Sequence, residues 1–136
     1  MSVNQEYLKF FINATEQAAY AASKYVGKND KIAADQAAVD SMRKEFNKIN
    51  MDGQIVIGEG EMDEAPMLYI GEEVGNKKGQ KLDIAVDPLE GTNFVAKGLP
   101  NAFSVLAVAE QNNLFFAPDT YMEKIAIGSG LPKNLV

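Results

Sequence analysis

The residues best suited to chemistry lie in the hexamer DPLEGT at 87–92, directly after the apolar stretch 82–86, which predicts a strand. Because Pro88 biases the residue before it toward extended backbone, we expect Asp87 and Glu90 to turn toward one point at the end of that strand. Two carboxylates that meet at one point can hold a divalent cation. The same pattern also fits a surface turn capped by Asp and Thr, so spacing alone leaves both interpretations open.

The last residues of the hexamer are suited to an anion. If residues 93–97 form a helical turn, the backbone N–H groups of Gly91 and Thr92 point at an anion such as phosphate. The Thr92 hydroxyl can then orient a water molecule.

Two further acids stand at the ends of predicted elements. Glu59 follows the predicted strand 54–57 between two glycines, which let backbone and cation approach closely. Asp35 lies four residues before Val39 on the apolar stripe of a predicted helix, where a carboxylate is costly unless it is paired or bound to metal. As a residue near the start of that helix, Asp35 has an equally weighted second interpretation as a cap. The other acids up to residue 75 are interpreted individually as a solvated loop: Glu61, Asp63, Glu64, Glu72 and Glu73.

Composition restricts the chemistry available to these acids. The 136 residues include no His and no Cys, which excludes disulfides, thiolate nucleophiles and the usual general base and transition-metal ligands. Oxygen-only ligands select Mg²⁺ or Mn²⁺, or Ca²⁺ in a large and flexible cage. Such a site, with a water held by threonine, favours in-line hydrolysis of a phosphate monoester.

Charge and hydropathy exclude other classes of protein. The net charge is -6 and a single arginine stands among scattered lysines, so a nucleic-acid binder is not expected. No stretch is long and apolar enough to span a bilayer, and the N-terminus lacks the pattern of a signal peptide. We therefore expect a cytoplasmic protein without membrane partners.

The elements that must position the acids follow from hydrophobic spacing. Apolar residues at helical spacing predict helices over about 4–26, ended by Gly27, and around 39–49. After the strands at 54–57 and 82–86, we expect an antiparallel meander of three more strands, at 103–109, 114–116 and 124–127, with its first turn at 111–113. Two helices followed by a largely antiparallel sheet indicate an α+β fold in one domain. The loop-like residues after 127 lead us to expect that the chain is a piece of a longer protein.

Four runs together resemble a known family. They are DKIAAD at 30–35, IGEGEMDEAPMLYIG at 57–71, DPLEGT at 87–92 and APDTYM at 117–122. They closely resemble the bacterial class II fructose-1,6-bisphosphatases, members of the lithium-sensitive, metal-dependent sugar phosphatase superfamily that includes inositol monophosphatase. The long second run is specific to the family, whereas the hexamer marks only the superfamily.

The resemblance implies a layered α/β sugar-phosphatase fold, of which residues 1–136 form the N-terminal metal- and phosphate-binding domain and the C-terminal half is absent from this chain. It implies Mn²⁺ or Mg²⁺ as cofactor, a sugar bisphosphate as substrate, and removal of the 1-phosphate of fructose-1,6-bisphosphate in gluconeogenesis. The implied metal ligands are Asp35, Glu59, Asp87 and Glu90. The implied substrate contacts are Glu90, Gly91, Thr92 and Tyr121. The pair that prepares the attacking water is Asp35 with Thr92, while the Leu89 carbonyl can face metal and Lys31 can meet phosphate.

Two alternatives stay open at this point. One is a truncated, non-catalytic metal-binding or interaction domain, which the missing half of the family's site supports. The other is a related enzyme that also hydrolyses sedoheptulose-1,7-bisphosphate, although that subtype carries Cys where Leu89 stands here. Homo-oligomer formation is left open.

Overall fold

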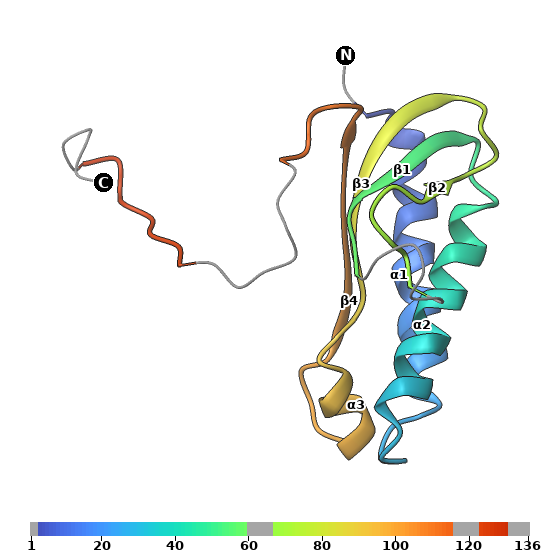
Figure 1. The fold of residues 1–136 in the computed structure, drawn as a ribbon, viewed down its shortest axis with the longest axis vertical. Helices are drawn as coiled ribbons and strands as arrows, with labels where there is room; N and C mark the ends of the chain where they lie inside the picture. The colour runs from blue at the N-terminus through green and yellow to red at the C-terminus, as the bar shows by residue number, and fades with distance from the viewer. Residues whose placement is uncertain (1–2, 60–66, 116–122, 131–136) are drawn as a thin grey trace.

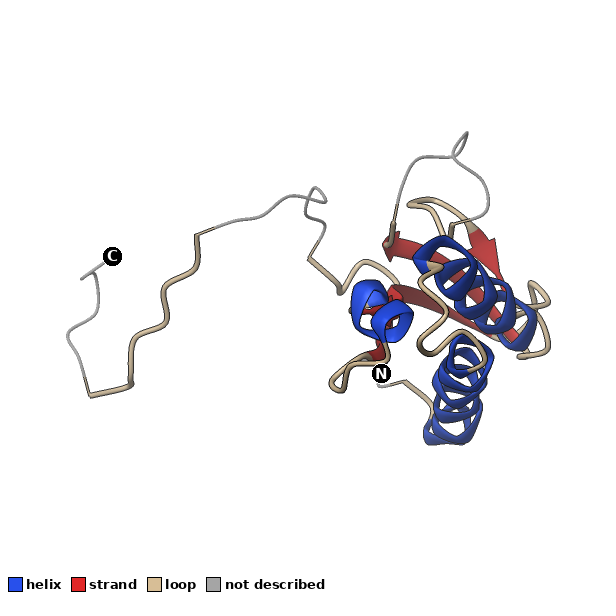
Figure 2. Ribbon diagram, turned by 90° about the horizontal axis from the view of Figure 1, so that it is seen from below, coloured by secondary structure: helices blue, strands red, loops and turns tan. Residues whose placement is uncertain are grey.

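The computed structural model describes residues 3–59, 67–115 and 123–130. Within them, two long helices cover one face of a four-stranded sheet, and a short helix lies at one end of it (Figure 1). Figure 2 shows the same layers from below, with both long helices on one side of the strands. In this part of the chain no helix is long and apolar enough to cross a lipid bilayer.

Helix α1 (Leu8–Ser23) follows a short 3-10 turn, η1 (Gln5–Tyr7), and packs along the second helix. Small side chains four residues apart lie on one side of a helix, which lets a neighbouring helix approach closely. The buried positions of α1 are Phe11, Ala14, Ala18 and Ala22. The helix predicted over 4–26 is therefore confirmed in its centre and shorter at both ends, and Gly27 follows it in the left-handed region, with φ +74°.

Helix α2 (Lys31–Phe46) carries the first of the candidate acids, Asp35. Its N-cap is Asp30, whose side chain accepts the Ala33 N–H at 2.9 Å. Its buried face is the apolar stripe predicted from spacing, with Val39, Met42 and Phe46. Ile49 is also buried, but it lies in the turn after the helix.

The sheet has the strand order β2-β1-β3-β4. Strands β1 and β3 run parallel, and the β1–β2 and β3–β4 pairs are antiparallel. The helices followed by this mixed, mostly antiparallel sheet confirm the α+β class. The strands are β1 (Met51–Ile57), β2 (Glu73–Val74), β3 (Gln80–Glu90) and β4 (Phe103–Glu110).

The predicted meander is wrong beyond its first strand. Strand β4 and the turn after it are present, but Leu114 and Phe115 form no strand, and neither do residues 124–127. Residue 116 lies outside the described residues. The carboxylate of Asp83 accepts hydrogen bonds from the N–H groups of Asn113 and Leu114, at 3.1 and 3.5 Å. These bonds hold the chain beside β3, whereas a hairpin would require it to turn back along β4. An apolar run forms a strand only where a neighbouring strand supplies its backbone partners. Phe115 is 82% exposed, so the apolar residues here are not packed against the sheet.

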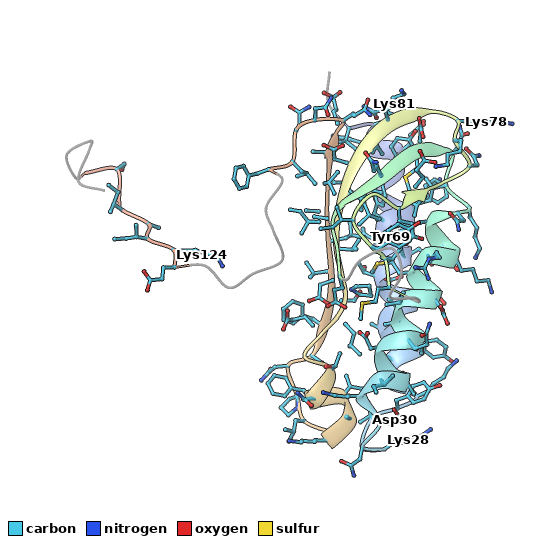
Figure 3. The ribbon with its side chains drawn as sticks, viewed as in Figure 1. Lys28, Asp30, Tyr69, Lys78, Lys81 and Lys124 are labelled. Atoms are coloured by element: carbon cyan, nitrogen blue, oxygen red, sulfur yellow. The ribbon has the colours of Figure 1, made fainter. Side chains whose placement is uncertain are left out.

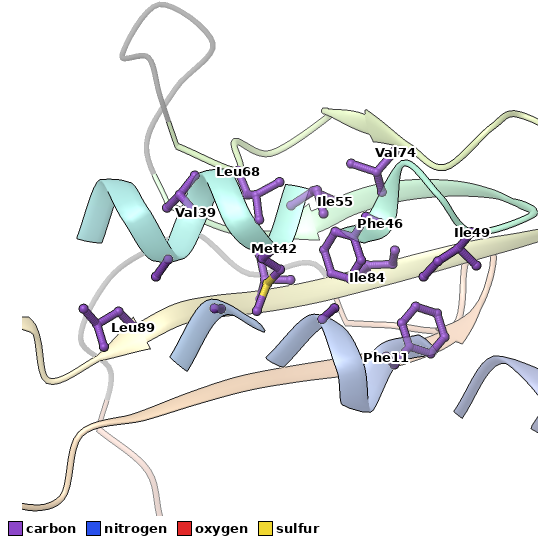
Figure 4. Close-up of a cluster of buried hydrophobic side chains, with 14 of the residues drawn as sticks. Phe11, Val39, Met42, Phe46, Ile49, Ile55, Leu68, Val74, Ile84 and Leu89 are labelled. Atoms are coloured by element: carbon purple, nitrogen blue, oxygen red, sulfur yellow. The ribbon is translucent and has the colours of Figure 1, made fainter. Parts of the chain in front are cut away.

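The core lies between the sheet and the two long helices (Figure 4). Side chains alternate along a strand, so the residues of β4 that point away from the helices lie on the opposite face of the sheet. On that face Phe103 and Val105 are exposed. The large side chains that fill the core are Phe46, Met42, Ile49, Met51, Ile55, Leu68, Leu82 and Ile84.

Candidate metal and phosphate site

The hexamer at 87–92 ends strand β3, which runs further than the predicted 82–86. Asp87 pairs with Val105 and Glu90 with Phe103, so β3 has one residue more than β4 between these two pairs. Such a bulge reverses the alternation of side chains, and it accommodates Pro88, which has no N–H to give to the ladder. The bulge therefore lets two carboxylates three residues apart face the same side, as predicted.

The electrostatics confirm that these two carboxyl groups are close. The pKa of Asp87 is raised from 3.8 to about 6, first by burial, then by a hydrogen bond with the Glu90 side chain and by the charge of Glu90. The charge of Asp35 adds a smaller increase, and the Leu89 N–H, which donates to Asp87 Oδ1 at 3.1 Å, lowers the pKa. Glu90 on β3 and Asp35 on α2 thus both act on Asp87.

Asp35 is not a helix cap. The N-cap of α2 is Asp30, and Asp35 stands one turn further on, on the buried side of the helix. Its Oδ1 atom is buried and accepts no hydrogen bond, and burial raises the pKa of the carboxyl group. A buried polar atom without a partner is unfavourable, so this oxygen is suited to a cation or a water that the protein is built to receive.

Asp35 and Thr92 line one pocket of about 200 Å³. Thr92 is the first residue of helix α3 (Thr92–Lys97), which confirms the helical turn predicted over 93–97. The cap position belongs to Gly91, with φ +84°, and no side chain hydrogen-bonds at that cap. The interpretation of Thr92 as a cap is therefore wrong. The remaining lining residues are Lys31, Ile32, Gln36, Val39 and Met67.

Glu59 lies two residues beyond the end of β1. Because β1 runs parallel to β3 and Ile57 pairs with Ala85, Glu59 lies two residues beyond one pair of neighbouring positions and Asp87, still within β3, two residues beyond the same pair. Both acids therefore lie toward the same end of the sheet. The N–H of Glu59 donates to the Leu68 carbonyl at 3.2 Å. A Cβ at Gly58 would stand 2.2 Å from that same carbonyl oxygen, so only glycine allows the close approach.

The remaining acids of the loop have different surroundings. Glu73 is exposed and paired with Lys77 at 2.8 Å, as expected of a solvated acid. Glu72 is buried, and the guanidinium of Arg43 holds both of its oxygens, at 2.6 and 3.0 Å. The prediction of a solvated Glu72 is therefore wrong, because its partner lies 29 residues away in sequence. Outside the described residues lie Glu61, Asp63, Glu64 and Tyr121.

The candidate acids are gathered only in part. Asp87 and Glu90 meet directly, Asp35 is near enough to influence Asp87, and Glu59 lies toward the same end of the sheet. Across residues 3–59, 67–115 and 123–130, however, no three or more Asp or Glu side chains are arranged to hold a metal ion. The oxygen-only donor set and the unpartnered Asp35 oxygen nevertheless fit a hard divalent cation.

The chain resembles a solved extragenic suppressor from Pyrococcus furiosus with a TM-score of 0.51 and 16% identity, covering 76% of this chain and 40% of that one. This likeness shows the fold alone. Residues 5–136 match the family described as bacterial fructose-1,6-bisphosphatase, glpX-encoded, and the chain belongs to that family.

Curated relatives agree with this assignment. Fructose-1,6-bisphosphatase 1 class 2 of Escherichia coli strain K12 is 56% identical over 120 residues, covering 88% of this chain and 36% of the relative. The D-fructose 1,6-bisphosphatase class 2/sedoheptulose 1,7-bisphosphatase of Thermosynechococcus vestitus is 54% identical over 127 residues, covering 85% of this chain and 37% of the relative. The chain thus spans little more than a third of the length of these relatives.

Proposed function

We propose that residues 1–136 form the N-terminal metal- and phosphate-binding part of a class II fructose-1,6-bisphosphatase. Together with the remainder of such a protein, they would hydrolyse the 1-phosphate of fructose-1,6-bisphosphate to fructose-6-phosphate and phosphate. The observation that carries the proposal is the carboxyl pair of the half-buried Asp87 and the exposed Glu90, with the unpartnered oxygen of Asp35 close by. Carboxyl groups brought together in this way repel one another unless a proton or a cation lies between them.

The proposed ligands of the cation are carboxylates from three elements: Asp35, Glu59, Asp87 and Glu90. This all-oxygen set selects Mn²⁺ or Mg²⁺ among the biological divalent cations. Bound there, the ion supplies positive charge to the phosphate oxygens and lowers the pKa of a water molecule.

The other roles belong to residues of the pocket. The Asp35 carboxylate accepts the proton of the attacking water at Oδ1, and the Thr92 hydroxyl orients that water toward phosphorus. The backbone of Gly91 and Thr92 and the ammonium group of Lys31 contact the phosphate. The family resemblance adds Tyr121 as a substrate contact.

The exposed face of the sheet supports a larger protein around this site. Phe103 and Val105 point away from the helices and are 55% and 44% exposed. In the Escherichia coli relative, the matched segment is 36% of the protein. We propose that the rest of such a protein covers this face and supplies the contacts to the sugar and to the second phosphate.

A second substrate has one observation in its favour. The Thermosynechococcus vestitus relative, 54% identical, is named for sedoheptulose 1,7-bisphosphate as well as for fructose 1,6-bisphosphate. Hydrolysis of both sugars by a protein that carries this segment is therefore the second candidate function.

Titration of the chain with Mn²⁺ in a calorimeter tests the site directly. We expect saturable binding, weakened by roughly 100-fold or more in Glu59→Gln and in Asp87→Asn, since each substitution removes a charged ligand oxygen. Glu73→Gln is the matched control, because Glu73 is an exposed acid paired with Lys77, and it should bind like the parent. If all three variants bind Mn²⁺ equally, the proposed ligand set is wrong.

A further inference from the structure

The segment 67–72 leads from the acidic loop back to β2. Backbone hydrogen bonds attach it to strand β1. The Gly71 N–H donates to the Ile55 carbonyl at 2.8 Å, and the Ile55 N–H donates to the Glu72 carbonyl at 2.9 Å. Figure 3 shows Tyr69, in the middle of the segment, beside the ribbon of α2. The segment therefore lies between strand β1 and helix α2.

The contact with α2 is made by one side chain. The guanidinium of Arg43 donates to both carboxylate oxygens of Glu72, at 2.6 and 3.0 Å, and its Nη2 also donates to the Met67 carbonyl. Arg43 is the only arginine of the chain. It thus holds the segment at its first and last residues, and the Glu72 side chain is only 11% exposed.

The first two residues of the segment connect it to the candidate site. Met67 lines the pocket that contains Asp35 and Thr92. The Leu68 carbonyl accepts the Glu59 N–H at 3.2 Å and stands so close to Gly58 that no side chain fits between them. A shift of the segment would therefore move both a wall of the pocket and the backbone of a proposed ligand.

We propose that Arg43 is a positioning residue: by bridging Met67 and Glu72 it holds the segment 67–72 in place, and through Leu68 it fixes the backbone of Glu59 at the site. The inference rests on the proposed function for the role of Glu59, but the bridge itself stands on geometry alone. A planar guanidinium binds a carboxylate and a nearby carbonyl together, whereas a lysine ammonium cannot reproduce this fork.

The variant Arg43→Lys tests the bridge, because it keeps the positive charge beside Glu72 and removes the fork. Amide hydrogen exchange of the metal-free chain reports directly on the Glu59 N–H, which is bonded to Leu68. We expect the exchange at Glu59 to accelerate roughly 10-fold or more while Ile84 in β3 keeps the parent rate. Mn²⁺ affinity should fall roughly 10-fold, the scale seen when a group that orients a ligand is lost.

Two further variants complete the test. Lys77→Met removes the ion pair with Glu73 on the neighbouring strand and should change neither measurement. Glu72→Gln keeps one acceptor oxygen for Arg43 and should change both in the same direction as Arg43→Lys, which keeps the test valid if that variant does not fold. Equal acceleration at Glu59 and Ile84, or none at either, overturns the proposal. If the parent binds no Mn²⁺, the ligand assignment fails, and the exchange at Glu59 alone decides the role of Arg43.

Discussion

Helix α2 meets carboxyl groups near both of its ends, and their partners differ. Toward its C-terminus, Arg43 holds the buried Glu72 with two hydrogen bonds. Near its N-terminus, Asp35 has a buried oxygen without a partner and lies close to Asp87 and Glu90, which carry the same charge. The first arrangement satisfies its carboxylate within the protein, and the second does not. Under the proposed function, this difference separates a structural acid from a metal ligand.

The largest expected effect comes from breaking the satisfied pair. Arg43→Met leaves the Glu72 carboxylate buried without its counter-charge, and we expect the free energy of unfolding to fall by about 3 kcal/mol. Urea denaturation of the chain at neutral pH measures this change. The double variant Arg43→Met with Glu72→Leu is the control, because replacing both partners by apolar groups is nearly neutral. A small loss in the single variant would show that the pair is well solvated.

The sequence predicted the acids around Asp35 far better than it predicted the pair of Arg43 and Glu72. The acids of the site lie at the ends of predictable elements, since Asp35 interrupts an apolar stripe and Asp87 follows an apolar run. The pair of Arg43 and Glu72 joins residues 29 positions apart, and no local pattern indicates such a contact. The local sequence alone therefore predicts a solvated Glu72.

In the fold, too, local features could be predicted and contacts between distant residues could not. Both long helices follow from local spacing, because their buried stripes are visible in the sequence, and β4 follows from its apolar run. The bulge that turns Asp87 and Glu90 to one side depends on the register between β3 and β4, which spacing within one strand does not contain. The strands predicted at 114–116 and 124–127 failed for a related reason, because apolar character alone does not provide a neighbouring strand.

The next effect concerns Thr92, which shares the pocket with the unpartnered oxygen of Asp35. In a full-length family member that carries this segment, Thr92→Ala should lower kcat roughly 100-fold, because the hydroxyl that orients the attacking water is lost. Mn²⁺ affinity should hardly change. Thr92→Ser retains the hydroxyl and should keep much of the rate. A normal kcat with a lowered Tm in Thr92→Ala would show that the side chain serves the fold only.

The smallest effect is a dependence of the free energy of unfolding on pH, which arises from Asp87, the neighbour of Asp35 at the candidate site. In the metal-free chain the pKa of Asp87 is about 6, above its ordinary value of 3.8, so the folded state binds this proton more tightly than the unfolded state. The stabilisation is complete below pH 3.8 and is lost as the pH rises through about 6. Because Asp87 is partly exposed and solvent screens its charge, we expect a loss of about 1 kcal/mol.

Urea denaturation in the presence of a chelator measures this loss. A range from roughly pH 3.5 to 7 includes both pKa values of Asp87, the ordinary one and the raised one. Asp87→Asn cannot ionise, so at neutral pH it should be more stable than the metal-free parent by about 1 kcal/mol and should gain nothing in acid. Glu73→Gln is the control, because the exposed Glu73 has a lowered pKa from its hydrogen bond with Lys77 and should leave the Asp87 slope in place. Mn²⁺ should reverse the order at neutral pH by stabilising the parent and not Asp87→Asn. If the parent instead gains stability relative to Asp87→Asn as the metal-free solution is brought from acid to neutral pH, the Asp87 carboxylate is satisfied within the protein, as Glu72 is, and the contrast between the two ends of α2 fails.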